Sequence, residues 1–414
     1  MITLPGYHTL SIFRRLTAEQ HYTLGLDFKG SNEIEKCPIK NDKKREIGWM
    51  YTYKENKGIR WLTLAFTINE RITVYGVKAI ITPKVLLNKD YLAAATEDDI
   101  QNFKSLFNIE ARKISHILGD IDSYSMSRSD YCLNFNLEEL GISCSPEKMM
   151  ILIKRGNIPK HFKERTEYSE VSKRQKTNKE SFYLESDSVT VNCYDKYTQL
   201  MNDEKHPCLN REDAKGIIRF EVQCMYRKLY SMAKTKINKS DISESSNEME
   251  LSDLYDALIS RSRVAIPIDA MLSDDIAADV IHKYFYKVIR GGDYYSLEIA
   301  RNMIQSEDCH QKKKDRLISA LTLTNLCRSI HKAIITLEGT ELQAFKRSLK
   351  DLEQLRINPV TIPREWGIEH VPNLLDTYYS KLYDVHKREI YEQCERDILN
   401  DYIKDCRKNG KVLG

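Results

Sequence analysis

The chain has 414 residues, with 64 lysines and arginines against 60 aspartates and glutamates and a formal net charge of +4. This near balance excludes a polycation that binds through bulk charge alone, and the length predicts two or three domains. No segment approaches the ~20 consecutive apolar residues of a membrane-spanning helix, so we expect no membrane partner.

The ten cysteines are scattered along the chain and include no Cys-x-x-Cys pair. This usage is typical of reduced, buried thiols and argues against a zinc site or a disulfide framework. Residues 1–5 lack the basic and apolar regions of a signal peptide. We therefore expect a cytoplasmic protein.

The first part of the chain reads as strands separated by turns. Residues 48–53, 61–68 and 71–81 have strand length, and turn-forming residues separate them, which predicts a β-meander. Residues 98–118 carry apolar residues at helical spacing. Ser145 is followed by Pro146 and Glu147, a pattern typical of a helix start.

Three later segments, residues 127–136, 187–197 and 216–224, read as strands with polar residues on one face. Alternate side chains of a strand share a face, so each segment has one apolar and one polar side. The polar sides hold Arg128, Asp130, Asn134 and Asn136, then Thr190, Asn192 and Tyr194, then Arg219, Glu221 and Gln223. In a shared sheet these form one polar surface; the alternative is an ordinary solvated sheet face.

The second of these segments ends in Tyr194, Asp195 and Lys196. A tyrosine held at a strand end beside a cation can attack a DNA phosphate once a base or cations favour its phenolate. Taken alone, the same residues would also suit a surface turn.

Residues 154–180 contain nine basic residues against four acidic ones. Such a patch suits a phosphate backbone, which makes Lys173, Arg174 and Lys176 candidate DNA contacts. The alternative is a lysine-rich surface loop.

Residues 238–250 are polar and rich in serine, which predicts a linker. We expect an α+β catalytic domain over residues 1–237, an antiparallel sheet with helices on it, and a mostly helical domain over residues 251–414. Helices are expected at residues 251–261, 274–289, 296–304, 312–337, 341–356 and, with breaks, 373–406.

The short helices and turns between residues 281 and 357 could hold a helix-turn-helix that binds DNA. Lys312, Lys313 and Lys314 open the long helix of this region and are candidate DNA contacts. A helical bundle with a solvated basic end is the alternative.

The order of these motifs resembles the gene II replication proteins of filamentous phages and the trans-acting Rep initiators of Gram-positive plasmids. Three elements carry the resemblance: a strand with Ser127, Arg128 and Asp130, a strand that ends in Tyr194 and Lys196, and a strand with Arg219, Phe220 and Glu221. It extends to residues 77–86 and 352–359, and so covers most of the chain.

The resemblance implies initiation of rolling-circle DNA replication by a metal-dependent, site-specific single-strand endonuclease and strand transferase. Tyr194 matches the nicking tyrosine, which would form a 5′-phosphotyrosyl intermediate and leave a 3′-hydroxyl primer. Asp130 and Glu221 match the acidic positions, and Arg128, Lys196 and Arg219 the basic ones. The implied partners are double-stranded and single-stranded DNA at an origin, with host helicase and polymerase in a bacterial cytoplasm.

The ten histidines include no His-x-His pair, the metal motif of other tyrosine nickases. The absence points to a Mg²⁺ or Mn²⁺ ion held by the carboxylates of Asp130 and Glu221. Tyr197 lies three residues after Tyr194 and would be either a second acceptor or a packing or DNA-stacking residue.

Two other functions stay open on the sequence alone. A relaxase of a conjugative element would use the same tyrosine chemistry. A non-enzymatic initiator that binds origin repeats through helical modules would explain the C-terminal half, but it leaves the polar sheet face without a purpose.

Overall fold

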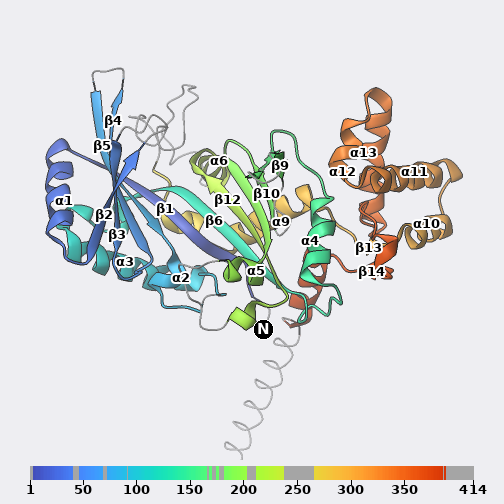
Figure 1. Ribbon diagram of the computed structural model, residues 1–414, viewed down its shortest axis with the longest axis horizontal. Helices are drawn as coiled ribbons and strands as arrows, with labels where there is room; N and C mark the ends of the chain where they lie inside the picture. Colours follow the sequence, from blue (N-terminus) through green and yellow to red (C-terminus); the bar gives the residue numbers. More distant parts are fainter. Residues whose placement is uncertain are drawn as a thin grey trace, which may run out of the picture. The chain divides into compact units, whose positions relative to one another are not determined.

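The computed structural model describes residues 3–40, 46–68, 72–90, 92–165, 167–169, 174–176, 181–202, 211–236, 265–385 and 387. The chain divides into two compact units. The first, called here the sheet unit, comprises Thr3–Asn134 and Ser145–Ile289. The second, called the helical unit, comprises Met1–Ile2, Phe135–Cys144 and Arg290–Gly414. Figure 1 gives the labels of their elements.

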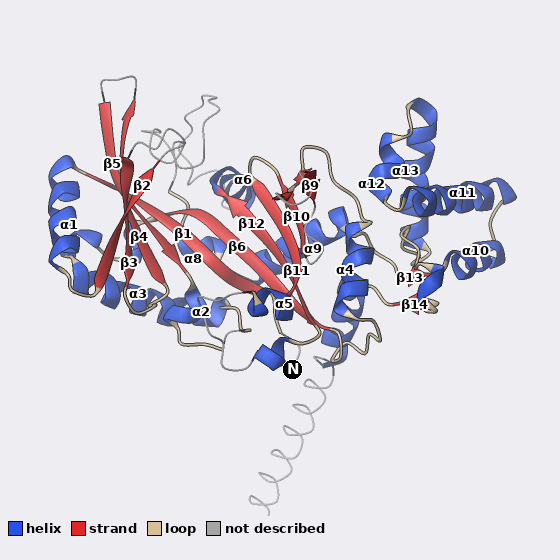
Figure 2. Ribbon diagram, viewed as in Figure 1, coloured by secondary structure: helices blue, strands red, loops and turns tan. Residues whose placement is uncertain are grey.

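In the described part of the sheet unit, ten strands form one sheet in the order β2-β3-β4-β5-β1-β6-β12-β11-β10-β7 (Figure 2). The strands are β1 (Gly6–Leu16), β2 (Ile34–Lys40), β3 (Glu46–Tyr53), β4 (Ile59–Ile68), β5 (Ile72–Ile81), β6 (Ser125–Asn136), β7 (Lys163–Glu164), β10 (Ser181–Glu185), β11 (Val189–Asp195) and β12 (Ile217–Met225). β2 to β5 pair as successive antiparallel neighbours, which confirms the predicted meander. In the β3–β4 turn, Gly58 takes a φ of 75°, and its N–H donates to Asn56 Oδ1 at 3.0 Å.

Helices cover the apolar surfaces of this sheet. They are α1 (Ala18–Gly30), α2 (Pro83–Leu86), α3 (Ile100–Ile114), α4 (Pro146–Lys154), α5 (Lys196–Met201), α6 (Tyr226–Lys236), α8 (Ile268–Met271) and α9 (Asp274–Val288). Trp61 of β4 packs against Phe107 of α3, and Phe220 of β12 against Phe285 of α9, each with ring centroids 5.4 Å apart. The apolar side of β12 is therefore buried under α9, which leaves its polar side for the site described below.

The helical unit contains α10 (Leu297–Ser306), α11 (Gln311–Cys327), α12 (Ile330–Ile335), α13 (Gly339–Gln354) and a short pair of strands, β13 (Tyr294–Tyr295) and β14 (His370–Val371). Its core consists of Ala300, Ile304, Leu317, Leu321, Leu352 and Ile357. The prediction of one helix over residues 312–337 was wrong. Arg328 takes a left-handed φ of 55°, and Ser329 caps the N-terminus of α12 by accepting from the Lys332 N–H.

The α+β class is confirmed, because the molecule combines a large antiparallel sheet with many helices. The helix-turn-helix expected between residues 281 and 357 stays a prediction. None of the helices in the described residues combines the length and the apolar character needed to cross a membrane.

The predicted domain boundary can be compared with the two units only in part. The predicted linker, residues 238–250, and the helix expected at residues 251–261 lie outside the described residues. α8 and α9, expected in the C-terminal domain, belong to the sheet unit, which ends at Ile289. Residues 374–385 are helical, and all later residues except 387 lie outside the described ranges.

Candidate active site and metal centre

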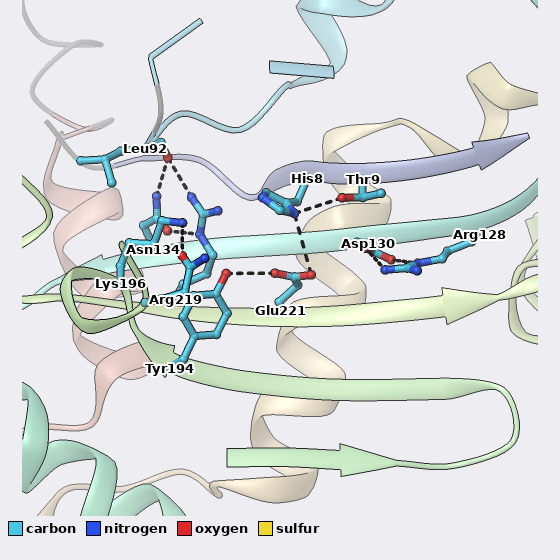
Figure 3. A network of polar contacts seen from close by, with 11 residues as sticks. His8, Thr9, Leu92, Arg128, Asp130, Asn134, Tyr194, Lys196, Arg219 and Glu221 are labelled. Atoms are coloured by element: carbon cyan, nitrogen blue, oxygen red, sulfur yellow. Dashed lines mark hydrogen bonds and ion pairs between the residues drawn. The ribbon is translucent and has the colours of Figure 1, made fainter. Parts of the chain in front are cut away.

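Three potential metal ligands converge on the polar side of the sheet. His8 of β1, Asp130 of β6 and Glu221 of β12 lie on three neighbouring strands (Figure 3). One ligand atom from each lies within 4.8 Å of the others. Asp130 and Glu221 are buried and His8 is half-buried. The two carboxylates predicted as metal ligands are therefore close together, and an imidazole joins them.

A β-bulge places His8 in this group. Along the pairing of β1 with β6, Tyr7 lies opposite Tyr131 and Thr9 opposite Asp130, so His8 is the extra residue of β1. Bulges redirect side chains next to functional sites. The Nδ1 atom of His8 lies 3.9 Å from Glu221 Oε1 and 3.2 Å from Thr9 Oγ1.

Asp130 is held by Arg128, two residues before it on the same strand face. The Nε atom of Arg128 donates to Asp130 Oδ1 at 2.6 Å, and Nη2 donates to Oδ2 at 2.5 Å. The pKa of Asp130 is raised to about 7, because the effect of burial, with a smaller contribution from the charge of Glu221, exceeds the opposing effect of Arg128. Arg128 thus orients a carboxylate.

Tyr194 lies beside this group on β11. In the pairing of β11 with β12, Tyr194 is opposite Arg219 and Asn192 is opposite Glu221. The Tyr194 hydroxyl donates to Glu221 Oε2 at 3.3 Å (Figure 3). Burial raises the pKa of Tyr194 well above its usual value, and the charge of Glu221 adds to this effect. The phenol is therefore protonated and hydrogen-bonded to a carboxylate of the metal-ligand group.

Arg219, the residue opposite Tyr194 on β12, is fully buried next to Asn134 and Leu92 (Figure 3). Its Nε donates to Asn134 Oδ1 at 2.7 Å, and its Nη2 donates to the Leu92 carbonyl at 3.0 Å. Among the described residues, its Nη1 has no hydrogen-bond partner. A buried guanidinium with an unused donor is costly, and an anionic ligand would satisfy it.

Two lysines complete the site. Asp195 caps α5 by accepting from the Tyr197 N–H at 3.1 Å, so Lys196 opens the helix, with its Nζ 5.8 Å from the Tyr194 ring centroid. Burial, together with Arg219 and Lys84, lowers the pKa of Lys196 to about 6. Lys84 of α2 is also buried, and burial and the charge of Arg219 lower its pKa to about 8.

His8 and Lys84 were absent from the sequence prediction. The alternation of Tyr7, His8, Thr9 and Leu10 is a weak strand signal that could have found β1. The β-bulge that directs the His8 side chain into the site has no comparable signal in the sequence. Lys84 follows Pro83 directly after β5, and an isolated lysine in that position reads as exposed.

The other predicted residues lie elsewhere. The Tyr197 hydroxyl donates to Glu212 at 3.3 Å, away from the Tyr194 group. Arg174 and Lys176 lie in β9 (Arg174–Lys176), which pairs with β8 (Glu167–Ser169), and Lys173 lies outside the described residues. Lys312, Lys313 and Lys314 lie in the first turn of α11, in the helical unit.

The chemistry of the three ligands fits a divalent cation. Burial and the nearby charges of Arg219 and Lys84 lower the pKa of His8 well below its usual value, so the imidazole is neutral and has a free lone pair. Two carboxylates and one imidazole suit Mn²⁺, and the carboxylate oxygens suit Mg²⁺.

Comparisons with known proteins give limited help. No protein-family model and no curated protein matches the chain. Among solved structures, the rolling circle replication initiator protein from Geobacillus stearothermophilus aligns at 10% identity with a TM-score of 0.27. The alignment covers 67% of this chain and 97% of that protein. The assignment below therefore rests on the geometry of the site.

Proposed function

We propose that this protein is a metal-dependent DNA nicking and joining enzyme that initiates rolling-circle replication. The observation that carries the proposal is the hydrogen bond of 3.3 Å from the Tyr194 hydroxyl to Glu221, a member of the metal-ligand group with His8 and Asp130. A nucleophile, its proton acceptor and a cation site are thus adjacent, as phosphoryl transfer to a tyrosine requires.

In this reaction the Tyr194 oxygen attacks one phosphorus of a DNA strand. Its proton passes to Glu221, the nearest acceptor, and the bond from phosphorus to the 3′-oxygen breaks. The departing oxygen takes up a proton and becomes the 3′-hydroxyl primer, while the 5′-phosphate stays on Tyr194. The phosphotyrosyl diester preserves the bond energy, so attack by a 3′-hydroxyl rejoins the strand.

The remaining side chains have roles that follow from their contacts. His8, Asp130 and Glu221 would hold Mg²⁺ or Mn²⁺, which stabilises negative charge on the phosphate oxygens. Arg128 orients Asp130. Arg219 supplies positive charge that favours the Tyr194 phenolate, and Lys196, with a pKa lowered to about 6, would gain a proton beside a bound phosphate. The second-acceptor role of Tyr197 and the DNA contacts of the basic residues stay predictions.

A nicking assay tests the proposal. The protein is incubated with Mg²⁺ and a supercoiled bacterial plasmid that carries its candidate origin. We expect open circles with protein attached to a 5′ end, and none with Tyr194→Phe, which keeps origin binding. Binding without nicking by the unmodified protein would instead favour a non-enzymatic initiator, and nicking at a transfer origin would favour a relaxase.

A further inference from the structure

A row of side chains crosses the polar face of the sheet, from the metal-ligand group toward the edge formed by β7. Glu221 of β12 is opposite Asn192 of β11, and Asn192 is opposite Tyr183 of β10. Arg165 follows β7 directly, and its N–H donates to the Tyr183 carbonyl at 2.9 Å. Residues directly opposite each other in a sheet share a face. Asn192, Tyr183 and Arg165 therefore continue the surface that carries Glu221.

Tyr183 presents an aromatic ring among polar neighbours. The ring is half-buried, and the residues on either side of it on the same face of β10 are Ser181 and Glu185. Across the strands its neighbours are Asn192 and Arg165, with Arg165 Cζ 5.2 Å from the ring centroid. A tyrosine that stabilises a core packs against apolar side chains, which these neighbours do not provide. A partly exposed ring beside a guanidinium is instead a surface on which a base can stack.

Asn192 places a hydrogen-bond acceptor in the middle of this row. Its Oδ1 atom is buried and has no hydrogen-bond partner among the described residues. A buried acceptor without a donor is costly, so a ligand that brings an N–H group would be favoured. Within a DNA strand the phosphodiester and the deoxyribose carry no such donor, whereas the bases do. The unpaired acceptor therefore fits a base better than a phosphate.

We propose that Asn192, Tyr183 and Arg165, called here the base subsite, bind one unpaired base of the DNA strand that is nicked. Tyr183 is the stacking platform, Arg165 flanks its ring, and Asn192 accepts from an N–H of the base. This inference rests on the proposed function, which brings the strand to Tyr194. β10 is two strands from β12, or about 10 Å across the sheet, so the bound base belongs to a nucleotide close to the attacked phosphate.

The test compares DNA with and without bases. A short fluorescent oligothymidylate and an abasic strand with the same sugar-phosphate backbone are titrated by anisotropy in EDTA, on a Tyr194→Phe background. Tyr183→Ala should weaken binding of the oligothymidylate about tenfold, as expected for the loss of one stacked base. Its affinity for the abasic strand should not change. The slope of log K against log salt should also stay the same, because no phosphate contact is removed.

Two variants and one modified strand serve as controls. Tyr183→Phe keeps the ring and should bind as the parent protein does. Tyr230→Ala removes another half-buried tyrosine beside a cation, with Lys234 Nζ 5.1 Å from its ring centroid, but in α6; it should also bind as the parent protein does. An oligothymidylate methylated at N3 lacks the base N–H and should bind the parent protein more weakly. Equal binding of that strand would overturn the role of Asn192.

Unchanged affinity of Tyr183→Ala for the oligothymidylate would overturn the inference, as would an equal loss for the abasic strand. Thermal melting followed by circular dichroism checks that each variant is folded. If Tyr183→Ala does not fold, Tyr183→Leu takes its place under the same criteria. Because no cleavage is measured, a base-dependent loss in a protein that does not nick DNA would contradict the proposed function alone. Nicking by a protein whose Tyr183→Ala variant binds DNA normally would contradict this inference alone.

Discussion

At the scale of single residues, the hydrogen bond between Tyr194 and Glu221 connects the proposed nucleophile to the proposed cation site. Burial keeps the phenol protonated, so the tyrosine is inactive until the charge of its surroundings changes. Positive charge near Glu221 or at the phosphate lowers the free energy needed to form the Tyr194 phenolate. In the proposed reaction, metal and DNA would thus supply the charge that activates Tyr194.

Arg128 gives the sharpest test of the metal ligands. Lysine cannot make the two parallel hydrogen bonds of Arg128 to Asp130, so Arg128→Lys should weaken Mn²⁺ binding about tenfold or more by misorienting that carboxylate. Isothermal titration calorimetry measures the affinity. Arg112→Lys, which changes an exposed pair with Asp120, is the control and should leave it unchanged. Equal Mn²⁺ affinity in Arg128→Lys and the natural protein would argue against Asp130 as a ligand.

Side-chain alternation predicted much of the site but not all of it. It placed Asp130, Glu221, Tyr194 and Arg219 on one polar face, and the register confirms that Tyr194 and Arg219 are direct neighbours. Alternation cannot predict a bulge, because the extra residue breaks the period of two on which it depends. For that reason His8 appears only in the structure.

At the scale of elements, the transition from β11 to α5 fixes the geometry around Tyr194. Asp195 ends the strand and caps the helix by accepting from the Tyr197 N–H and from Thr198 Oγ1, at 3.1 and 2.7 Å. Taken alone, the sequence also allowed an ordinary surface turn here. The acid instead determines where the helix starts, and hence where Lys196 lies.

Loss of this cap should destabilise the protein. Asp195→Ala leaves backbone N–H groups of α5 unsatisfied, so the free energy of unfolding should fall by about 1 kcal/mol. Urea denaturation followed by circular dichroism measures the change. Asp187→Ala, at an exposed position before β11, should have little effect. A larger loss in Asp187→Ala than in Asp195→Ala would contradict the assigned cap.

The cysteines report on the packing of the sheet. Burial raises the pKa of Cys132 to about 11 and that of Cys224 to about 12, whereas Cys37 is exposed. Thiolates are the reactive form, so iodoacetamide at neutral pH should modify Cys37 first and leave Cys132 and Cys224 unmodified in the folded protein. Peptide mass spectrometry over time measures the order. Modification of Cys224 as fast as Cys37 would mean that β12 is not buried under α9.

At the scale of the whole molecule, the described site residues all belong to the sheet unit. The meander and the α+β class followed from alternation and turns, which are local signals. The division of the chain into two units could not be predicted from local signals in the same way. α9 joins the sheet unit because Phe285 packs on Phe220, a contact between residues 65 positions apart that composition does not reveal.

The helical unit is expected to bind DNA through the first turn of α11. The N-terminus of a helix carries a partial positive charge, so lysines there are unfavourable for helix stability. Their presence therefore suggests a role in phosphate binding. Replacement of Lys312, Lys313 and Lys314 by glutamine should weaken binding to duplex DNA and reduce its salt dependence. Lys346→Gln, Lys350→Gln and Arg347→Gln in α13 form the control, and salt-dependent anisotropy is the measurement. An unchanged salt slope in the α11 variant would show that these lysines do not contact DNA phosphates.

In the proposed function, Tyr194 becomes covalently attached to DNA. The most direct measurement is mass spectrometry of the protein after reaction with origin DNA and Mg²⁺, followed by nuclease and protease digestion. We expect a peptide that carries a nucleotide phosphate on Tyr194, and no such adduct in Tyr194→Phe. Nicked DNA with the adduct on another residue, or with no adduct in the natural protein, would contradict it.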